Sequence, residues 1–355
     1  MDISIIGANG STGKHLAARI LLERLLLPTD RLQLVGHQQG SSGKALYGFR
    51  QDLRDAFDEH CPIIDIALTP EEVVADIIVM AAGSTIAPNS TPGSPPPSRD
   101  ELARHNLGIA LPYAEALARY GHGHEVVIVV SNPVELMVAI FAQRYDRHRV
   151  MGMGAYQDSL RFRREIARSL NVPRGAVRAM VLGEHGDHLV PLWSSVAIQG
   201  FSGSETARAI QHLRSSDRSV DFPEAVRWAR RAVLESAARG DLAAAFEQFH
   251  TLPPDLRVVI GPFLTLYSGS KTDIATANAT IDLIKSIASG KDTVVATQVQ
   301  LDGELPGFHG PIGAPVLINT KGWETVHEIG LTSGEHVLLQ QSANTVNEKL
   351  RQWQK

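Results

Sequence analysis

Residues 1–150 alternate short runs of aliphatic and β-branched residues with longer amphipathic segments. The runs predict strands at Ile3–Ile6, Leu32–Val35, Ile63–Leu68, Ile77–Ala81, Val126–Val130 and Val150–Gly152. Between several of them the apolar residues recur at helical spacing, as in His15–Leu26 and Arg99–Arg119. Strands that alternate with helices indicate βαβ units, and such units build a parallel sheet. The alternation therefore predicts an α/β domain.

The pattern changes after the sixth predicted strand, and we expect a domain boundary near Gly154. This boundary divides the chain into a first domain over residues 1–153 and a second over residues 154–355. In the second domain we expect helices at Asp158–Leu170, Pro223–Arg239, Ala275–Ser289 and about Ser333–Gln354, and strands at Arg178–Leu182, Thr293–Gln300 and Pro315–Asn319. Helices and strands that do not alternate regularly favour an α+β arrangement there.

Two segments look inserted into this pattern. Residues 84–98 contain five prolines and four serines, which neither a helix nor a central strand tolerates. This segment is either a disordered surface linker or a functional arm. The run Pro95–Pro97 favours a semi-rigid arm, hinged near Gly93 and with Gly83 at its base. The second segment, Asp241–Gly261, is alanine-rich at its start and contains two adjacent prolines, which predicts an extra helix and a turn.

The composition excludes several classes of function. The 355 residues carry a net charge of −4, so no polybasic field attracts nucleic acid or an anionic membrane. No apolar run approaches the roughly 20 residues that a membrane helix needs. The chain opens with a predicted strand, which leaves no room for a secretory signal, and Cys61 is its only cysteine. We therefore expect a cytoplasmic protein without an internal disulfide.

A glycine-rich turn follows the first predicted strand and opens the first helix. Only glycine lets a backbone turn tightly and approach a pyrophosphate, whose charge then lies at the helix N-terminus. A phosphate-binding loop of the nucleotide triphosphatase type is excluded, because His15 stands where serine or threonine must hold magnesium. The turn therefore predicts dinucleotide binding, with the candidate residues Gly7, Asn9, Gly10, Ser11, Thr12 and Gly13.

The end of the second predicted strand bears on the choice of cofactor. An NAD-preferring site usually has Asp or Glu there to bind the ribose 2′-hydroxyl. This chain has no carboxylate at that position, and several donors that could bind a 2′-phosphate follow: the candidates are Gly36, His37, Ser41, Ser42 and Lys44. The pattern favours NADP, or the use of both NADP and NAD. The alternative is a solvated turn that does not contact the cofactor.

Two further segments carry residues suited to acid–base chemistry. His185 lies in Val181–Asp187, and its imidazole titrates near neutral pH, as proton transfer requires. Asp158 would hold the second ring nitrogen, and Arg161, one helical turn later, can grip a carboxylate with two hydrogen bonds. Taken singly, each has an ordinary structural reading, since a lone histidine is usually structural and an Asp–Arg helix pair is usually exposed.

Taken together and in this order, these segments resemble the lactate/malate dehydrogenase family. The resemblance extends from Ile3 to the C-terminal helix and includes the sequence motifs Asn132–Glu135, Asp158–Arg163 and Leu182–His188. It implies a Rossmann dinucleotide-binding domain followed by a catalytic α+β domain. It also implies reversible oxidation of a 2-hydroxy acid to a 2-oxo acid with NAD or NADP and no metal, in a homodimer or homotetramer.

The resemblance assigns roles to further residues. Arg99, after the proline-rich segment, would polarise the substrate carbonyl, and Asn132 would hold both the substrate and the nicotinamide. Thr272 would contact the substrate. Four more residues would contact the cofactor: Ala82, Gly83, Asn106 and Val130. The alternative from another class is a catalytically retired nucleotide-binding or structural protein, against which the His185–Asp158 pair argues.

The sequence departs from the family in the loop that distinguishes lactate from malate. Malate dehydrogenases carry an arginine a few positions after the counterpart of Ala82–Gly83, and lactate dehydrogenases carry a glutamine. Here residues 84–98 contain no arginine or lysine and form a longer loop. The substrate is either a larger 2-oxo acid, or malate with a relocated cation such as Lys271, since an unpaired buried carboxylate is costly.

Overall fold

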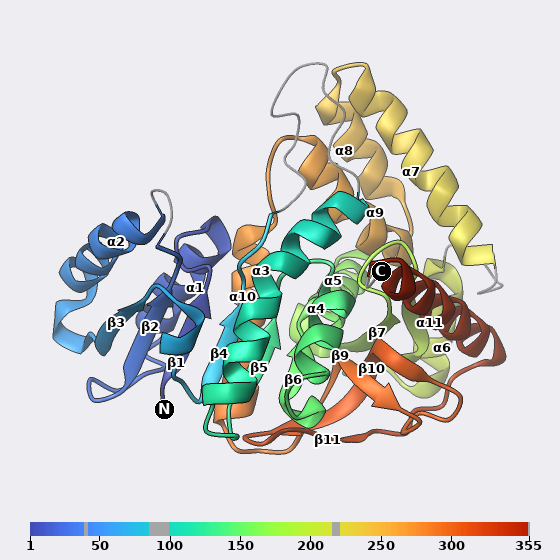
Figure 1. The fold of residues 1–355 in the computed structure, drawn as a ribbon. Coiled ribbons are helices and arrows are strands. Elements are labelled where there is room, and N and C mark those ends of the chain that lie inside the picture. Colours follow the sequence, from blue (N-terminus) through green and yellow to red (C-terminus); the bar gives the residue numbers. More distant parts are fainter. Residues whose placement is uncertain (39–41, 85–98, 215–220, 354–355) are drawn as a thin grey trace.

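A computed structural model describes residues 1–38, 42–84, 99–214 and 221–353 of the chain (Figure 1). The predicted arm around Gly93 and the cofactor candidate Ser41 lie outside these ranges. No helix within the described ranges is long and apolar enough to cross a membrane.

The described residues form one eleven-stranded sheet with helices around it. The strands are β1 (Ile3–Ile6), β2 (Arg31–Val35), β3 (Ile63–Ala67), β4 (Ile77–Met80), β5 (Val126–Val129), β6 (Val150–Gly152), β7 (Val177–Gly183), β8 (Leu189–Ile198), β9 (Thr293–Asp302), β10 (His309–Asn319) and β11 (Gly322–Val326). The helices are α1 (Ser11–Leu22), α2 (Ser42–Phe57), α3 (Arg99–Tyr120), α4 (Val134–Ala142), α5 (Gly154–Leu170), α6 (Gly203–Leu213), α7 (Phe222–Ala238), α8 (Leu242–Thr251), α9 (Pro254–Tyr267), α10 (Asp273–Ala288) and α11 (Ser333–Trp353).

The first half of the sheet is parallel, as the alternating pattern predicts. Its strands lie in the order β3, β2, β1, β4, β5, β6, so the direction of winding changes between β1 and β4. All residues of β1, β4 and β5 are buried, which explains why they are apolar except for Ser4 of β1, whose hydroxyl donates to Gln33. Ligands of such sheets bind at the carboxyl ends of the strands beside this switch point. The fold therefore gathers the segments after β1, β4 and β5 around one crevice.

The second half of the sheet is antiparallel. Gly152 of β6 pairs with Gln298 of β9, and β9 pairs along its length with β10. β10 meets β7 only where Gly313 faces Gly183. A Cβ on Gly313 would lie 2.7 Å from the Gly183 carbonyl oxygen, so glycine allows this close approach. β7 pairs in turn with β8, and the loop between these two strands carries His185.

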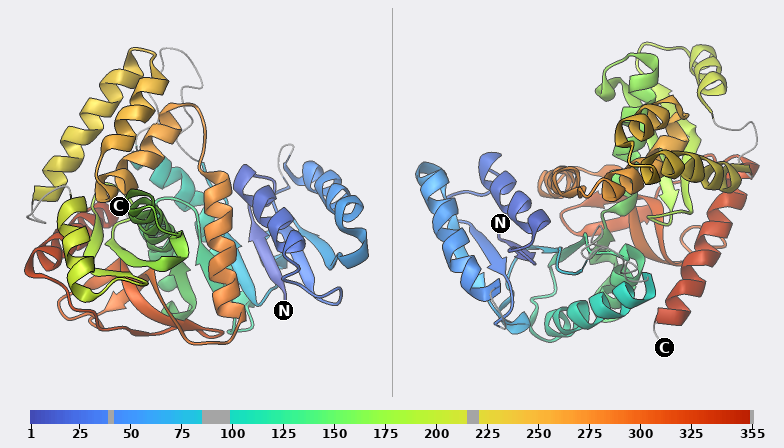
Figure 2. Two further views of the ribbon diagram at one scale, coloured as in Figure 1. Left: turned by 180° about the vertical axis from the view of Figure 1, so that it is seen from behind. Right: turned by 90° about the horizontal axis from the view of Figure 1, so that it is seen from above.

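Helices cover both faces of the sheet. α3 and α4 lie on the face toward the viewer in Figure 1, and α1 and α10 pack against each other on the opposite face (Figure 2). α7, α8 and α9 form a group above the sheet in Figure 1, where α9 packs on α5. α11 runs beside the antiparallel half and packs on β8 and β10. The crevice is thus bordered by helices from both halves of the chain.

Helix α1 ends earlier than its apolar spacing predicts. The spacing continues to Leu26, but the helix ends at Leu22. Arg24 adopts a left-handed backbone with φ of 51°, and the Leu25 N–H donates to the Ile20 carbonyl at 3.1 Å. This backbone arrangement closes a helix and reverses the chain direction.

Other elements were not predicted from the sequence. These are β8, β11, α6 and the helix α9. The segment Asp241–Gly261 contains the predicted extra helix, α8, and the predicted turn, but its second part belongs to α9. Pro253 is the N-cap of α9 and Pro254 lies in its first turn, where proline does not break a helix. The two prolines therefore begin a helix as well as end one.

Candidate active site

A cavity of about 300 Å³ lies at the crevice. Its described lining comes from the segment after β5, from α5, α9, α10 and α11, and from the loop between β7 and β8. Seven of the residues singled out by sequence reasoning line it: Val130, Asn132, Asp158, Arg161, His185, Lys271 and Thr272. The structure therefore brings together residues that are far apart in the sequence.

The glycine-rich turn has the geometry that a dinucleotide requires. Gly7 has a left-handed φ of +89°, and a Cβ there would lie 2.7 Å from Ala82 Cα. A Cβ on Gly13 would lie 2.3 Å from the Gly7 carbonyl oxygen. The Asn9 amide oxygen is buried without a hydrogen-bond partner among the described residues, an acceptor that a ligand hydroxyl would satisfy. This turn and the following α1 N-terminus fit a nicotinamide dinucleotide.

Asn106 joins two segments that border the cofactor crevice. Its side-chain oxygen accepts the Ser84 N–H at 2.7 Å, and its amide nitrogen donates to the carbonyls of Ser84 at 2.9 Å and Asn132 at 2.6 Å. The residue is 1% exposed. A Cβ on Gly83 would lie 3.0 Å from the same amide. In this structure Asn106 therefore holds the backbone on which the crevice is built.

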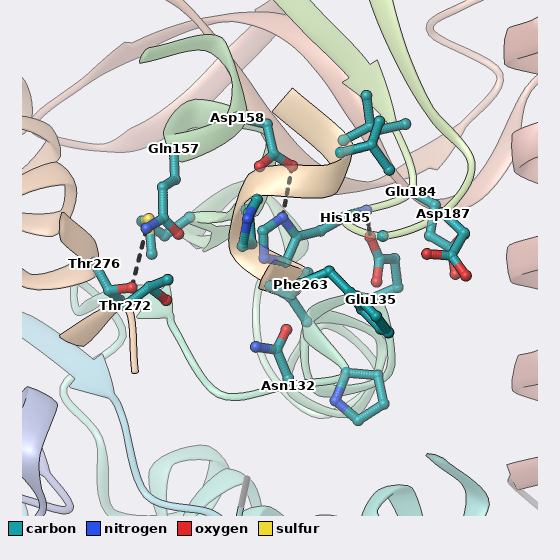
Figure 3. Close-up of a pocket in the computed structure, with 18 of the residues that line it drawn as sticks. Asn132, Glu135, Gln157, Asp158, Glu184, His185, Asp187, Phe263, Thr272 and Thr276 are labelled. Carbon is teal, nitrogen blue, oxygen red and sulfur yellow. Dashed lines mark hydrogen bonds and ion pairs between the residues drawn. The ribbon is translucent and has the colours of Figure 1, made fainter. Parts of the chain in front are cut away.

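His185 and Asp158 form a hydrogen-bonded pair at the cavity (Figure 3). His185 Nδ1 lies 2.7 Å from Asp158 Oδ2, and Arg161 Nη1 donates to Asp158 Oδ1, also at 2.7 Å. The Asp158 side chain is 2% exposed, whereas those of His185 and Arg161 are 18% and 13% exposed. One buried carboxylate thus orients an imidazole and a guanidinium that both reach the cavity.

The charges of this cluster set its protonation. Burial alone would raise the pKa of Asp158, but the charges and hydrogen bonds of His185 and Arg161 outweigh burial and hold that pKa below its usual range. Burial alone would lower the pKa of His185, but the charge and hydrogen bond of Asp158 outweigh it and raise that pKa, with Arg161 opposing. Asp158 is therefore ionised, and His185 keeps its proton to a higher pH than usual.

The start of α5 explains how the cluster is built. Asp158 and Arg161 lie one turn apart on this helix, so their side chains share one face. A Cβ on Gly154, the first residue of α5, would lie 2.5 Å from His185 Cγ. Glycine at the helix start therefore lets the imidazole rest against the backbone, and Asp158 follows one turn later.

Gln157 connects this cluster to α10 and was not predicted from the sequence. Its amide lies 3.0 Å from Thr276 Oγ1, and in the orientation that satisfies all its neighbours the amide oxygen also accepts from Arg161 Nη2 at 2.9 Å. Thr272 and Thr276 border the cavity on the same side (Figure 3). Gln157 thus helps to fix the Arg161 guanidinium relative to Thr276 of α10.

Two buried carboxylates lie next to His185 and were also missed. Glu135 Oε1 accepts the backbone N–H of His185 at 2.7 Å, and Gln298 donates to the same oxygen at 3.3 Å. Glu184 is paired with Lys349 of α11. Burial and the nearby charge of Glu184 raise the pKa of Glu135 to about 7, against the opposing effect of His185. The loop that carries His185 therefore contacts a titratable group whose pKa is about 7.

Two family models match the chain. The model described as "lactate/malate dehydrogenase, NAD binding domain" matches residues 1–152, and that described as "lactate/malate dehydrogenase, alpha/beta C-terminal domain" matches residues 157–246. The chain belongs to the lactate/malate dehydrogenase family. The predicted family and the predicted α/β fold class, with its Rossmann and C-terminal α/β parts, are confirmed. The chain is an oxidoreductase of this family with a nicotinamide-binding domain.

Named relatives support the assignment over the whole chain. An L-2-hydroxycarboxylate dehydrogenase (NAD(P)(+)) from Methanocaldococcus jannaschii is 27% identical over 98% of this chain and 97% of the relative. A malate dehydrogenase from Sorangium cellulosum is 30% identical over 77% of this chain and 73% of the relative. The solved lactate dehydrogenase from Cryptosporidium parvum, complexed with lactic acid and nicotinamide adenine dinucleotide, has a TM-score of 0.75 and 22% identity, covering 100% and 98% of the two chains. That last likeness shows the shared fold.

Some residues that the sequence analysis singled out lie apart from the cluster or outside the described part of the structure. Arg99 is the first residue of α3, but its side chain is outside the described part of the structure. His37 and Lys44 are exposed near the start of α2. Lys271 lines the cavity but is exposed at its rim. Thr12, in the cofactor turn, donates to Asp273 at 2.9 Å.

Some of the site residues that the sequence analysis missed carry a signal in the local sequence, and others do not. Glu135 and Glu184 lie in the same sequence motifs as Asn132 and His185. Their position in the sequence therefore already indicated that they belong to the site. Phe263 of α9 also lines the cavity, but nothing in its local sequence signals that. Its place depends on how α9 packs against α5, which is a tertiary property.

Proposed function

We propose that this chain catalyses the reversible NAD(P)-dependent oxidation of a 2-hydroxy acid to a 2-oxo acid. The observation that carries this proposal is the 2.7 Å hydrogen bond between His185 and Asp158. Arg161 donates a hydrogen bond to the same Asp158 carboxylate. Both groups line a cavity that also reaches the crevice of the dinucleotide-binding sheet. We further propose that residues 1–153 form the cofactor domain and residues 154–355 the substrate domain.

In this mechanism His185 moves the proton. Its Nδ1 is held by Asp158, which leaves Nε2 to donate a proton to the substrate oxo oxygen. The ionised Asp158 stabilises the imidazolium before the transfer and fixes the ring orientation. The nicotinamide, when bound, supplies the hydride. In the oxidation direction, neutral His185 accepts the hydroxyl proton.

The other residues of the cluster hold the substrate. Arg161 offers its remaining donors to the substrate carboxylate, and a planar guanidinium can bind it with two hydrogen bonds. Thr272 and Asn132 line the cavity on either side and would orient the substrate. We assign Arg99 to the polarisation of the carbonyl on the family resemblance.

An absorbance assay tests the proposal directly. The purified chain is mixed with NADH or NADPH and a panel of 2-oxo acids, and oxidation of the reduced nicotinamide is followed. Turnover of at least one acid is expected. Tight binding of reduced cofactor with no turnover of any acid would instead support the second candidate, a retired nucleotide-binding protein.

We also propose that NADPH is used at least as well as NADH. β2 is followed by Gly36 and His37, and α2 begins close by at Ser42. The described residues 36–38 and 42–44 include no carboxylate, and the α2 N-terminus favours an anion. A Cβ on Gly36 would lie 2.7 Å from Leu46 Cδ1, so an aspartate there would displace buried Leu46. His37 is exposed and accepts a carboxylate without that clash.

The expected result is a kcat/KM ratio of NADPH to NADH of one or more in the natural chain. His37→Asp should lower that ratio by about tenfold, because a like-charge contact costs on the order of 1–4 kcal/mol near a surface. His37→Asn is the matched neutral control and should leave the ratio nearly unchanged. A natural ratio that strongly favours NADH would contradict the proposal.

A further inference from the structure

The part of the cavity beyond His185 is bordered mainly by apolar side chains. They come from three helices that border the cavity: Leu102 of α3, Val259, Pro262, Phe263 and Leu266 of α9, and Val346 of α11. The sequence places these residues far apart, and only the packing of the helices joins them. Apolar side chains of this kind gain free energy by covering apolar parts of a ligand, and they cannot replace the hydration of a charged group.

Phe263 is the largest apolar side chain that α9 contributes to this wall. It is half-buried and is drawn between the imidazole of His185 and Asn132 in Figure 3. The guanidinium of Arg230 lies over its ring at 4.6 Å from the ring centre. Arg230 and Phe263 both line the cavity, so this contact holds the ring at the cavity wall.

Apart from the exposed Lys271, the described cations of the cavity lining are already engaged. Arg230 makes two hydrogen bonds to Asp187, one of them at 3.0 Å. Lys349 is paired with Glu184, and Lys271 is exposed to solvent at the rim. Arg161 is needed for the carboxylate that every 2-oxo acid carries.

The carboxylates of the cavity act against a dicarboxylic substrate. Glu135 and Glu184 are both buried beside His185, and Asp187 follows in the same loop. A substrate carboxylate placed in this region would lose its hydration, and the cations Arg230 and Lys349 are already paired with Asp187 and Glu184. The charge pattern therefore disfavours malate and oxaloacetate.

Resting on the proposed function, we propose that the substrate is a 2-oxo or 2-hydroxy acid with a bulky, uncharged aliphatic or aromatic side chain, and that Phe263 selects this side chain. The reaction is unchanged: a hydride and a proton add across the oxo group, and the side chain takes no part in the chemistry. Phe263 acts on specificity through contact with that side chain.

A substrate panel tests the proposal on the natural chain. The kcat/KM values are measured for phenylpyruvate, 4-methyl-2-oxopentanoate, pyruvate and oxaloacetate with the better reduced cofactor. One of the first two is expected to exceed oxaloacetate by at least about tenfold, as each methylene in an apolar pocket changes kcat/KM by about 10–200-fold. A preference for oxaloacetate or pyruvate overturns this inference but leaves the proposed function intact. No turnover of any acid overturns the proposed function itself.

Phe263→Ala tests the residue. It should lower kcat/KM for phenylpyruvate by about 10–100-fold and change that for pyruvate by less than about threefold. The matched control is Tyr267→Ala, which removes an aromatic ring from the same helix at an exposed position outside the cavity lining, and which should leave the profile unchanged. Equal losses for phenylpyruvate and pyruvate in Phe263→Ala overturn the role of Phe263 in specificity.

A charge-neutral pair of changes tests the competing reading, in which Arg230 binds a second carboxylate. The double variant Asp187→Asn with Arg230→Met removes the ion pair and leaves the net charge unchanged. The inference expects kcat/KM for oxaloacetate to stay the same or rise relative to that for phenylpyruvate. A fall in the oxaloacetate value of about a hundredfold or more, with phenylpyruvate spared, overturns it and identifies Arg230 as the relocated cation.

Discussion

Replacing His185 by asparagine is expected to lower kcat by about 10²–10⁴-fold, the usual contribution of a positioned general acid or base. Asparagine keeps a polar group of similar reach but cannot exchange a proton near neutral pH. The glycine-rich turn that binds the dinucleotide lies in another part of the crevice, so the affinity for NADPH, measured by fluorescence titration, should change little. The variant thus separates proton transfer from cofactor binding.

The same loop offers a matched control. His188 lies three residues after His185 but is not among the residues that line the cavity. His188→Asn should keep kcat within about threefold of the natural value, well below the 10²–10⁴-fold effect of a lost general acid. If His185→Asn retained more than about a tenth of the natural kcat, His185 would not be the proton donor.

The parallel half of the sheet was predictable because its strands are buried on both faces. A strand buried on both faces is apolar at nearly every position, so β4 and β5 appear in the sequence as continuous apolar runs and β1 as a run interrupted only by Ser4. β8 is harder to recognise because exposed and half-exposed positions interrupt its buried ones. α6 contains no buried residue at all, so burial leaves no apolar signal along it.

The catalytic cluster was predictable for a different reason. Asp158 and Arg161 are linked by helical spacing, and His185 stands in a sequence segment that resembles the family. The wall opposite them was not predictable, since Phe263, Arg230 and Asp187 meet only after α7 and α9 have packed. The local sequence indicates which side chains can react. The shape of the cavity that selects a substrate depends on packing between distant parts of the chain.

Replacing Asp158 by asparagine is expected to lower kcat by about 10²–10⁴-fold as well, through His185 rather than through contact with the substrate. Asparagine fills the same space but cannot stabilise the imidazolium or fix the ring tautomer. It also removes the charge that raises the pKa of His185. Oxo-acid reduction needs protonated His185, so its rate falls as the pH rises through that pKa. The midpoint of this fall should therefore move to lower pH in the variant.

A second variant shows which group sets that midpoint. Glu135 also titrates close to this range, with its pKa raised to about 7 by burial and by Glu184, and it touches the His185 backbone. Glu135→Gln keeps that hydrogen bond but removes the titration and a weaker contribution to the pKa of His185. We expect its midpoint to move down less than that of Asp158→Asn, and its kcat to fall less. If Glu135→Gln abolished the pH dependence while Asp158→Asn left it in place, the proton would be controlled by Glu135 and the His185–Asp158 assignment would be wrong.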